Sequence, residues 1–429
     1  MLKCNKLIIV ALLLLVQLGV TAQNNTNSPY TRFGYGNLAD HSFGANRSMG
    51  GVGIALRDPC QINPMNPASY SCMDSMTFLF DFGAGLQLAK FSDGANKDNK
   101  LNGNLEYFAM QFPIARWLAM SIGVKPYSFV GYSYGAVETI GDTKYANTYS
   151  GEGGLNDLYA GLSIDIWKKR LAIGANVGYL FGDITHSQNL TFSDDASSAY
   201  TTSRSQSMDV RDLKLDFGVQ YTHPISATES ITLGLTYSPS NRLNSTSYDS
   251  FQRYSSSSGT LIESKVDTLK GVASDLPETY GVGLSYTKKN KLTVAADFLY
   301  ETWDKCSYLG QNDAFNNRMR IAAGVEYIPA YNKKLYFNRI KYRAGVHYSN
   351  SYLNVNMTDG GVAKNYGYKE YGATVGFGFP LVDNRSYLNF GVEYVNVKPE
   401  HPSMISEQYF RFSVSYAFNE FWFFKRKVD

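Results

Sequence analysis

Cysteine is scarce in this sequence, and apolar runs long enough to form a membrane-spanning helix are absent after residue 22. Four cysteines occur in 429 residues. Cys4 lies before the apolar N-terminal run rather than directly after a cleavage site, which argues against an N-terminal lipid anchor. The sequence therefore predicts neither a helical membrane protein nor a lipoprotein.

An excess of charge of one sign is also missing. Lys and Arg number 40 against 37 Asp and Glu, which gives a formal net charge of +3. Nucleic-acid-binding proteins carry a basic patch or stripe. The balance of charges therefore argues against a nucleic-acid partner.

The residue patterns of common catalytic and metal sites are missing as well. The sequence has no G-x-S-x-G elbow, no C-x-x-C pair, and five histidines that occur singly. The glycine run at residues 50–53 does not follow a strand and open a helix, as a dinucleotide loop would. We expect no catalytic residues, no metal site and no cofactor.

Residues 1–22 are typical of a secretory signal peptide. Lys3 and Lys6 form a short positive region, an apolar run follows, and small residues precede the expected cleavage after Ala22. Export would place Cys60 and Cys72 in an oxidising compartment. A disulfide between them and a pair of free thiols are both open interpretations, because spacing alone does not establish bridge geometry.

The strongest pattern in the chain is the alternation of apolar and polar residues, repeated along its length. In YFRFSVSYAF, Phe410, Phe412 and Val414 fall on one face of a strand and Arg411 on the other. Each such segment has about ten residues, the length of a tilted membrane-crossing strand. Aromatic residues recur near the segment ends, as in the girdles of outer-membrane barrels. The pattern predicts an all-β transmembrane antiparallel barrel over residues 76–419, with its apolar face in lipid and its polar face in the lumen.

We count about fourteen strands, an even number as in bacterial barrels. They begin near Thr77, Leu105, Leu118, Asn156, Leu171, Leu213, Ile231, Thr279, Leu292, Arg318, Ile340, Tyr371, Tyr387 and Tyr409. Long polar connections at residues 185–211 and 240–278 are expected to be extracellular loops. Short connections at residues 168–170 and 288–291 are expected to be periplasmic turns. The chain is expected to be a monomer in the bacterial outer membrane.

The end of the chain has two further features. The last strand, with alternating aromatic residues up to Phe418, is similar to the signal that the barrel-insertion machinery reads, so this machinery is an expected partner during biogenesis. Residues 420–429 are expected to form an aromatic and basic tail on the periplasmic side. The tail packs at the membrane interface in one interpretation and docks a periplasmic protein in the other.

Residues 23–75 precede the first strand and are too many for a simple terminus. They include RSMGGVGIALRDPCQINPMNPASYS, which is rich in glycine and contains two Asn-Pro pairs that favour turns. A compact, irregular segment before a wide barrel is expected to fill the lumen as a plug.

This segment resembles the N-terminal hatch of the FadL-type outer-membrane transporters of long-chain fatty acids and other hydrophobic compounds. The shared features are an Arg-x-x-x-Gly-x-Gly run, an Ala-x-x-Asp step and an Asn-Pro-Ala triplet. The resemblance covers the hatch by motif and the barrel by architecture. It implies that the plug and its gate include Arg47, Gly50, Gly51, Gly53, Asp58, Asn66, Pro67 and Ala68.

The resemblance also implies ligand capture from outside and lateral release through an opening at a kink in the third strand. Here the third strand contains Pro126, which belongs at an edge or a bulge because proline donates no hydrogen bond to a sheet. Gly131 and Gly135 would permit the bend. Pro126 lies inside a kinked strand in one interpretation and just beyond the strand end in the other.

Charged side chains of both signs are expected to face the lumen and to form a network there. The cations are Arg318, Arg320, Lys341, Arg343 and Arg411, and the anions are Asp297, Glu301, Glu326 and Glu393. In one interpretation the network braces strands and plug. In the other, one of the cations is spare and anchors a ligand carboxylate.

The predicted function follows from the resemblance. It is uptake of hydrophobic compounds such as long-chain fatty acids by hatch-gated diffusion, with membrane lipid and a hydrophobic small molecule as partners. The alternative is a FadL-like barrel that serves as a structural subunit of an envelope secretion or assembly complex, with a periplasmic or outer-membrane protein partner. A transporter predicts an apolar pocket beneath the extracellular loops and an opening in the wall. A scaffold predicts a filled lumen and stoichiometric companions.

Overall fold

The computed structural model describes residues 26–421, except residues 141–142, 168, 193–199, 257, 290, 331–334, 360 and 382–384. The predicted signal peptide and residues 422–429 of the predicted tail lie outside the described residues. Strands make up most of the described chain, and none of the helices in it is both long and apolar enough to cross a membrane.

The elements fall into wall strands and additional short elements. The wall strands are β2 (Thr77–Ser92), β3 (Lys97–Ala115), β4 (Leu118–Pro126), β6 (Thr143–Trp167), β7 (Leu171–Phe192), β8 (Tyr200–Ser226), β9 (Glu229–Ser238), β14 (Thr279–Lys288), β15 (Leu292–Glu301), β16 (Arg318–Tyr327), β17 (Lys341–Asn350), β20 (Tyr368–Pro380), β21 (Tyr387–Pro399) and β22 (Ser406–Phe421). The other strands are β1 (Asn37–Leu38), β5 (Ser128–Ile140), β10 (Asn241–Arg242), β11 (Ser245–Ser255), β12 (Leu261–Lys270), β13 (Asp275–Leu276), β18 (Val355–Asp359) and β19 (Val362–Tyr366). The helices are η1 (Pro29–Arg32), α2 (Gly44–Arg47), η2 (Pro67–Cys72), η3 (Trp303–Lys305) and η4 (Tyr336–Arg339).

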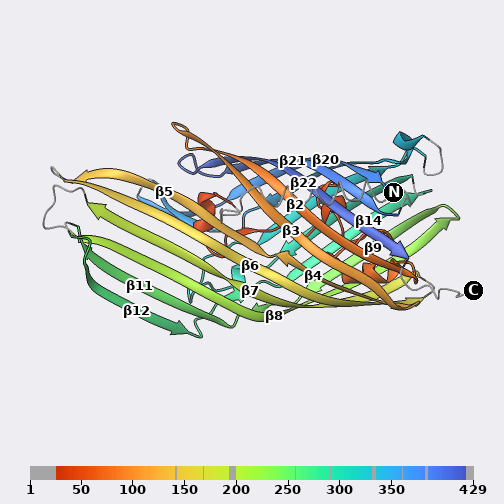
Figure 1. The fold of residues 1–429 in the computed structure, drawn as a ribbon, viewed down its shortest axis with the longest axis horizontal. Helices are drawn as coiled ribbons and strands as arrows, with labels where there is room; N and C mark the ends of the chain where they lie inside the picture. Colours follow the sequence, from red (N-terminus) through yellow and green to blue (C-terminus); the bar gives the residue numbers. More distant parts are fainter. Residues whose placement is uncertain are drawn as a thin grey trace, which may run out of the picture.

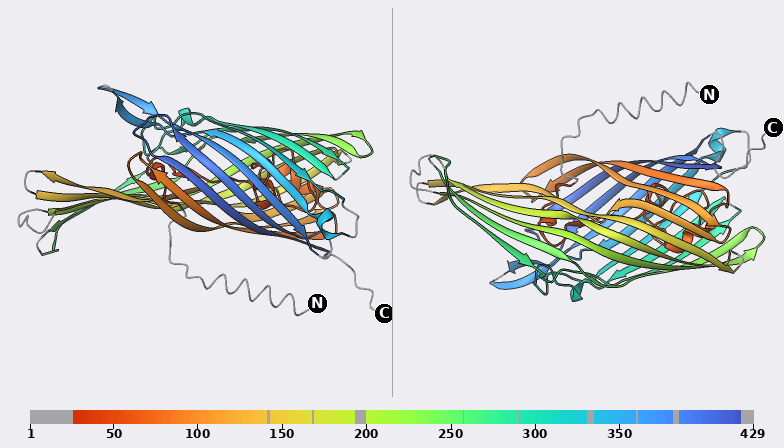
Figure 2. Two further views of the ribbon diagram at one scale, coloured as in Figure 1. Left: turned by 90° about the horizontal axis from the view of Figure 1, so that it is seen from above. Right: turned by 60° about the horizontal axis from the view of Figure 1, so that its bottom comes forward.

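The fourteen wall strands form a closed antiparallel barrel, as the sequence predicts. Each pairs with the next along the chain, with β4 followed in the wall by β6. β22 then pairs with β2 from Phe421 opposite Thr77 to Ser406 opposite Ser92, which closes the cylinder (Figures 1 and 2). Closure removes the free edges that would expose unpaired backbone groups to lipid.

The two faces of the wall follow the predicted alternation. In β17, the Val346 side chain points outward and the residue is 57% exposed, whereas Lys341 and Arg343 point inward and are buried. In β22, Phe412 and Val414 are exposed on the outer surface, as expected for a lipid-facing row.

Short turns and chain ends define the two ends of the barrel. The turns between β6 and β7 and between β14 and β15 lie at the end where β2 begins and β22 finishes. Lys169 and Lys289 adopt left-handed backbone conformations there, with φ of 61° and 54°. We call this the periplasmic end and the opposite one the extracellular end, because barrels of this class have short periplasmic turns.

The two expected extracellular loops are wrong in large part. β7 continues to Phe192, β8 begins at Tyr200, and β11 and β12 lie within the second predicted loop. Beyond the barrel, β5, β6, β7, β8, β11 and β12 form an extended sheet, which we call the arm (Figure 1). Serine and threonine are frequent in the ends of these strands. These ends therefore lack the apolar alternation that predicts a membrane-crossing strand.

The third strand line is interrupted at Tyr127. β4 ends at Pro126, and β5 resumes the same line at Ser128. β4 pairs with β3 no further than Val124 opposite Phe108, and β5 pairs with β6 but not with β3. Pro126 is therefore the last residue of β4 and lies at a break in the wall. It lies inside an interrupted strand line, as in the first interpretation, and at the end of a strand segment, close to the second.

Candidate functional site

The N-terminal residues contact the inner face of the barrel through their backbone. The N–H groups of Gly53 and Ile54 donate to Oδ2 of Asp297 at 2.6 and 2.9 Å. The N–H of Gly50 donates to Oγ1 of Thr374 at 2.8 Å. We refer to residues 26–75 as the plug.

Glycine is required where the plug meets the wall most closely. Gly50 and Gly51 have φ of +75° and +77°, the left-handed region that favours glycine. A Cβ on Gly50 would lie 2.8 Å from the backbone oxygen of Val346. The predicted Arg-x-x-x-Gly-x-Gly run therefore forms a tight turn against the wall.

The Asn-Pro-Ala triplet caps and docks a short helix. Oδ1 of Asn66 accepts the N–H of Ala68 at 3.1 Å, and Pro67 opens η2. Nδ2 of Asn66 donates a hydrogen bond to the backbone oxygen of Ile54 at 2.7 Å. Oγ of Ser163 donates one to the backbone oxygen of Ala68 at 2.9 Å. The triplet thus links two plug segments to β6.

Ion pairs join the plug to the wall at four points. Arg47 pairs with Glu106 of β3, Asp40 with Arg320 of β16 at 2.8 Å, and Asp58 with Lys341 of β17 at 2.8 Å. The fourth pair joins Arg57 to Asp165 of β6 at 3.0 Å. Burial alone would raise the pKa of Asp40, but Arg320 and Arg47 outweigh it and hold that pKa below its ordinary value.

The remaining cations predicted as ligand anchors also contact carboxylates. Arg318 lies 3.4 Å from Glu301, Arg343 2.7 Å from Glu326, and Arg411 3.4 Å from Glu393. Asp297, the fourth predicted anion, instead accepts the plug N–H groups described above. The lumen is therefore braced by matched charges.

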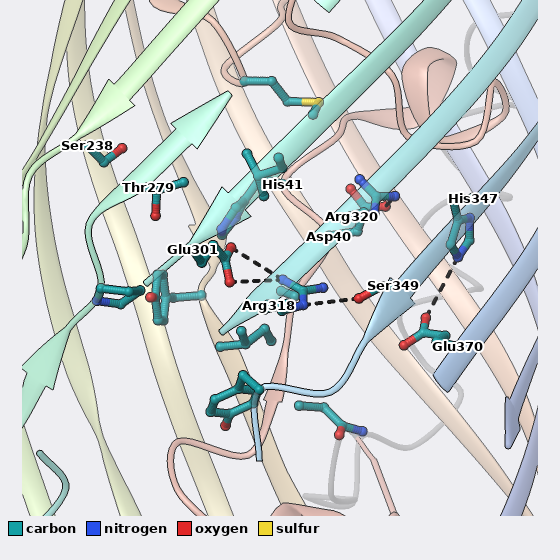
Figure 3. Close-up of a pocket in the computed structure, with 18 of the residues that line it drawn as sticks. Asp40, His41, Ser238, Thr279, Glu301, Arg318, Arg320, His347, Ser349 and Glu370 are labelled. Atoms are coloured by element: carbon teal, nitrogen blue, oxygen red, sulfur yellow. Dashed lines mark hydrogen bonds and ion pairs between the residues drawn. The ribbon is translucent and has the colours of Figure 1, made fainter. Parts of the chain in front are cut away.

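A polar cavity of about 180 Å³ lies between plug and wall (Figure 3). Asp40, Glu301, Arg318, Arg320 and Glu370 contribute charged groups to its lining. Its charged lining differs from the apolar pocket that a transporter of hydrophobic compounds predicts. Within the described residues, no group of His, Cys, Asp and Glu is arranged to hold a metal ion.

Aromatic side chains fill the space beneath the extracellular connections. Tyr35 of the plug is fully buried there, with ring centroids 5.1 Å from Tyr308, 5.9 Å from Trp303 and 6.0 Å from Phe315. The hydroxyl of Tyr352 donates to the backbone oxygen of Gly36 at 2.6 Å. These rings form one packed cluster, which we call the aromatic chamber, and Tyr35 of the plug lies within it.

The N-terminal part of the plug also lies along the break in the wall. We call residues 26–38 the strap. Asn37 and Leu38 pair as β1 with Phe129 and Ser128 of β5. A cavity of only about 80 Å³ remains between the strap, β3 and the end of β4. The predicted kink glycines contribute contacts here too: Gly131 exchanges hydrogen bonds with Oγ1 of Thr31 at 3.2 Å.

Gly135 lies farther along β5, where a Cβ would approach the backbone oxygen of Asn147 to 2.6 Å. Its role is therefore close packing against β6. The two plug cysteines, Cys60 and Cys72, are free thiols in this structure. Burial raises the pKa of each thiol to about 12.

Sequence reasoning missed three residues that hold the plug. Asp40 pairs with Arg320, Tyr35 fills the aromatic chamber, and Gly36 approaches the oxygen of Phe129 so closely that a Cβ would lie 2.3 Å from it. All three precede the motif segment. The Phe-Gly-Tyr-Gly sequence around Tyr35 was the one available signal, because paired glycines beside aromatics indicate close packing.

Comparison with known families decides where this barrel belongs. The matching family is described as BamG, and the match spans residues 1–429. The chain belongs to the BamG family. No curated protein matches it.

Solved structures similar to this BamG-family chain are FadL-type barrels, which confirms the sequence resemblance at the level of the fold. The toluene transporter TodX of P. putida is 14% identical, with a TM-score of 0.62 over 90% of this chain and 100% of that one. The toluene transporter TbuX of Ralstonia pickettii is 15% identical, with a TM-score of 0.56 over 88% and 98%. A Pseudomonas aeruginosa FadL homologue is 15% identical, with a TM-score of 0.56 over 89% and 99%. The chain thus has the fold of the FadL-type barrels.

Proposed function

We propose that this barrel is a sealed structural subunit of an envelope assembly complex. The observation that carries the proposal is that one segment, the strap with its adjoining plug residues, fills both the aromatic chamber and the break in the wall. A conduit for hydrophobic compounds needs both spaces free. The family description BamG supports the same proposal, because that name points to a protein of barrel assembly.

The paired charges of the lumen support this proposal further. All five predicted anchor cations contact carboxylates, so each would have to give up an ion pair to bind a ligand carboxylate. Removing one partner of a buried pair costs several kcal/mol, about 3–5. Because breaking these pairs costs free energy, the network favours a plug that stays in place and braces the wall.

The test is native mass spectrometry of the protein extracted gently from its own outer membrane. We expect the barrel to appear with other protein chains in fixed stoichiometry and without a mass in the range of fatty acids or aromatic hydrocarbons. A barrel that carries such a ligand and no protein companion would overturn the proposal.

A second candidate function, uptake of hydrophobic compounds, is favoured by the break between β4 and β5 and by the fold shared with the toluene transporters. In this case the plug residues from Arg47 to Ala68 would act as a gate and the strap would leave the break on ligand binding. The discriminating measurement is retention of toluene and oleate by the purified wild-type barrel. Saturable retention would favour uptake, and its absence would favour the structural role.

A further inference from the structure

The arm has two edge strands, and they differ in character. β12 pairs with β11 and carries Glu263, Lys265 and Asp267 along its length. Charges of this kind protect a sheet edge from pairing with another chain. β5 has the sequence YSYGAV over residues 132–137, with neither a charge nor a proline. β5 is therefore the edge that can accept a further strand.

β5 already accepts a strand at its lower end. β1 pairs with Ser128 and Phe129, and the N–H and C=O of Gly131 both bond the hydroxyl of Thr31. In the part of the chain that the structure describes, no strand pairs with that side of β5 beyond Phe129. The strap thus covers the start of an edge that continues into the arm.

The backbone groups of this edge have a defined direction. The bonds of Gly131 point away from β6, and the register between β5 and β6 runs without a shift from Val130 to Ile140. Successive residues of a strand direct their backbone groups to opposite sides in an antiparallel pair. The N–H and C=O groups of Ser133, Gly135 and Val137 therefore face the open side.

A cleft lies next to this edge. It has a volume of about 530 Å³ and separates Ser133 and Tyr134 from the hairpin that joins β2 to β3. Asn27 and Pro29 of the strap form part of its lining. Figure 1 shows β5 diverging from β3 toward the extracellular end.

We propose that residues 132–137 of β5 bind one extended segment of a partner protein as an added strand of the arm. The proposal rests on the proposed function and names the surface through which the subunit holds its companion. Main-chain hydrogen bonds would supply the affinity, as in other cases of strand addition. Val137 is 72% exposed and Tyr134 37% exposed on opposite faces of β5.

The side chains of β5 define the partner segment. Tyr132 and Tyr134 lie on the face that continues the lumen, so β-branched or aromatic residues fit opposite them. Ser133 and Gly135 lie on the outer face and favour small neutral residues opposite them. The partner segment is therefore an uncharged, alternating stretch of extended chain.

A second copy of this chain would offer the same uncharged edge, and its binding is one outcome of the test below.

The test compares variants of the full-length protein, each isolated gently from its own outer membrane. Val137→Pro removes one N–H from the open edge and Val137→Lys adds a charge there, and neither touches the bonds to β6. Val266→Lys is the matched control, because Val266 is 59% exposed on the other edge strand. Native mass spectrometry measures how much partner each barrel retains. Hydrogen exchange measures the amides of Ser133 and Gly135 in the intact particle and in the barrel stripped of its companions.

We expect both Val137 variants to lose partner occupancy about tenfold, Val137→Pro through a lost main-chain hydrogen bond and Val137→Lys through the added charge at the edge, while Val266→Lys retains it. The edge amides should exchange more slowly in the intact particle than in the stripped barrel. Retention of the partner by both Val137 variants with unprotected edge amides would overturn this inference and leave the subunit role intact. A wild-type barrel isolated without companions would overturn the proposed function itself. An added mass equal to a second copy of this chain would overturn the choice of partner.

Discussion

Arg320 and Asp40 fasten the barrel wall to two separate plug segments. Nη2 of Arg320 lies 2.8 Å from Oδ2 of Asp40, and the same guanidinium donates to the backbone oxygens of Gly50 and Gly51 at 3.1 and 3.3 Å. One side chain of β16 therefore holds Asp40, which follows the strap, and the glycine turn together.

Arg320→Met should destabilise the barrel strongly. It leaves Asp40 without its wall partner, and breaking a buried pair costs about 3–5 kcal/mol. Arg204→Met is the matched control, because Arg204 pairs with Asp249 at 2.7 Å on the exposed arm. Exposed pairs contribute about 0–1 kcal/mol. Thermal unfolding in detergent should show a much larger loss for Arg320→Met, and equal losses would contradict the bracing role.

Acid should weaken the plug through Asp40. The pKa of Asp40 is lowered in the folded state, so its contribution to stability is present above the ordinary pKa of 3.8 and is lost as the pH falls below that value. Asp40→Asn removes this dependence at that site. Unfolding temperatures measured at pH 5 and at pH 2.5 should therefore fall less in Asp40→Asn than in the wild type. An equal fall in both proteins would rule out Asp40 as a source of the acid sensitivity.

Tyr35→Ala should empty the aromatic chamber. Tyr35 is fully buried, and removing a large buried aromatic side chain costs about 3–5 kcal/mol. An apolar cavity of this kind binds small aromatic molecules, so added toluene should raise the unfolding temperature of the variant. Phe33→Ala serves as the control, because Phe33 is 37% exposed. No response of Tyr35→Ala to toluene would show that the chamber collapses or is not apolar.

Gly36→Ala should release the strap from β5. Gly36 has φ of +84°, and a Cβ there would lie 2.3 Å from the oxygen of Phe129. Gly94→Ala is the matched control, because Gly94 has φ of +94° with nothing within 4 Å of its Cβ position. Hydrogen exchange in residues 28–38 should accelerate in Gly36→Ala alone. The same exchange in both variants would mean that backbone strain, and not the contact with β5, accounts for the effect.

Cys60 and Cys72 should react slowly with alkylating reagents. Burial raises the pKa of each thiol to about 12, so little thiolate is present at pH 8. Iodoacetamide should label both cysteines quickly after unfolding and slowly before it, with or without a reductant. A native mass that rises on reduction would reveal a disulfide and contradict the free-thiol state.

The barrel could be predicted from the sequence because lipid imposes a period of two on every wall strand. All fourteen predicted starts fall within or one residue before a wall strand, and Ile340, just before β17, is the one that falls outside. The arm could not be predicted in this way. Its strands extend beyond the closed barrel and carry polar residues on both faces, so a pattern such as Ser203, Ser205 and Ser207 gives no sign of a strand.

The plug could be placed by its motif, but its contacts could not. The sequence predicted that Arg318, Arg343 and Arg411 face the lumen with acidic partners, because the alternation places all of these residues on the inner face. It did not supply Asp40 or Tyr35, since irregular backbone has no period from which to read a direction. Long-range contacts of the strap with β5 and with the extracellular connections depend on the closed barrel.

We propose that the strap and plug keep this barrel closed to hydrophobic compounds. The test is the entry of toluene and oleate into liposomes that contain the purified wild-type barrel, with empty liposomes and liposomes containing Gly36→Ala measured alongside. We expect wild-type liposomes to take up both compounds no faster than empty ones. Saturable uptake by the wild-type barrel would show that the barrel is open to these compounds and is a transporter.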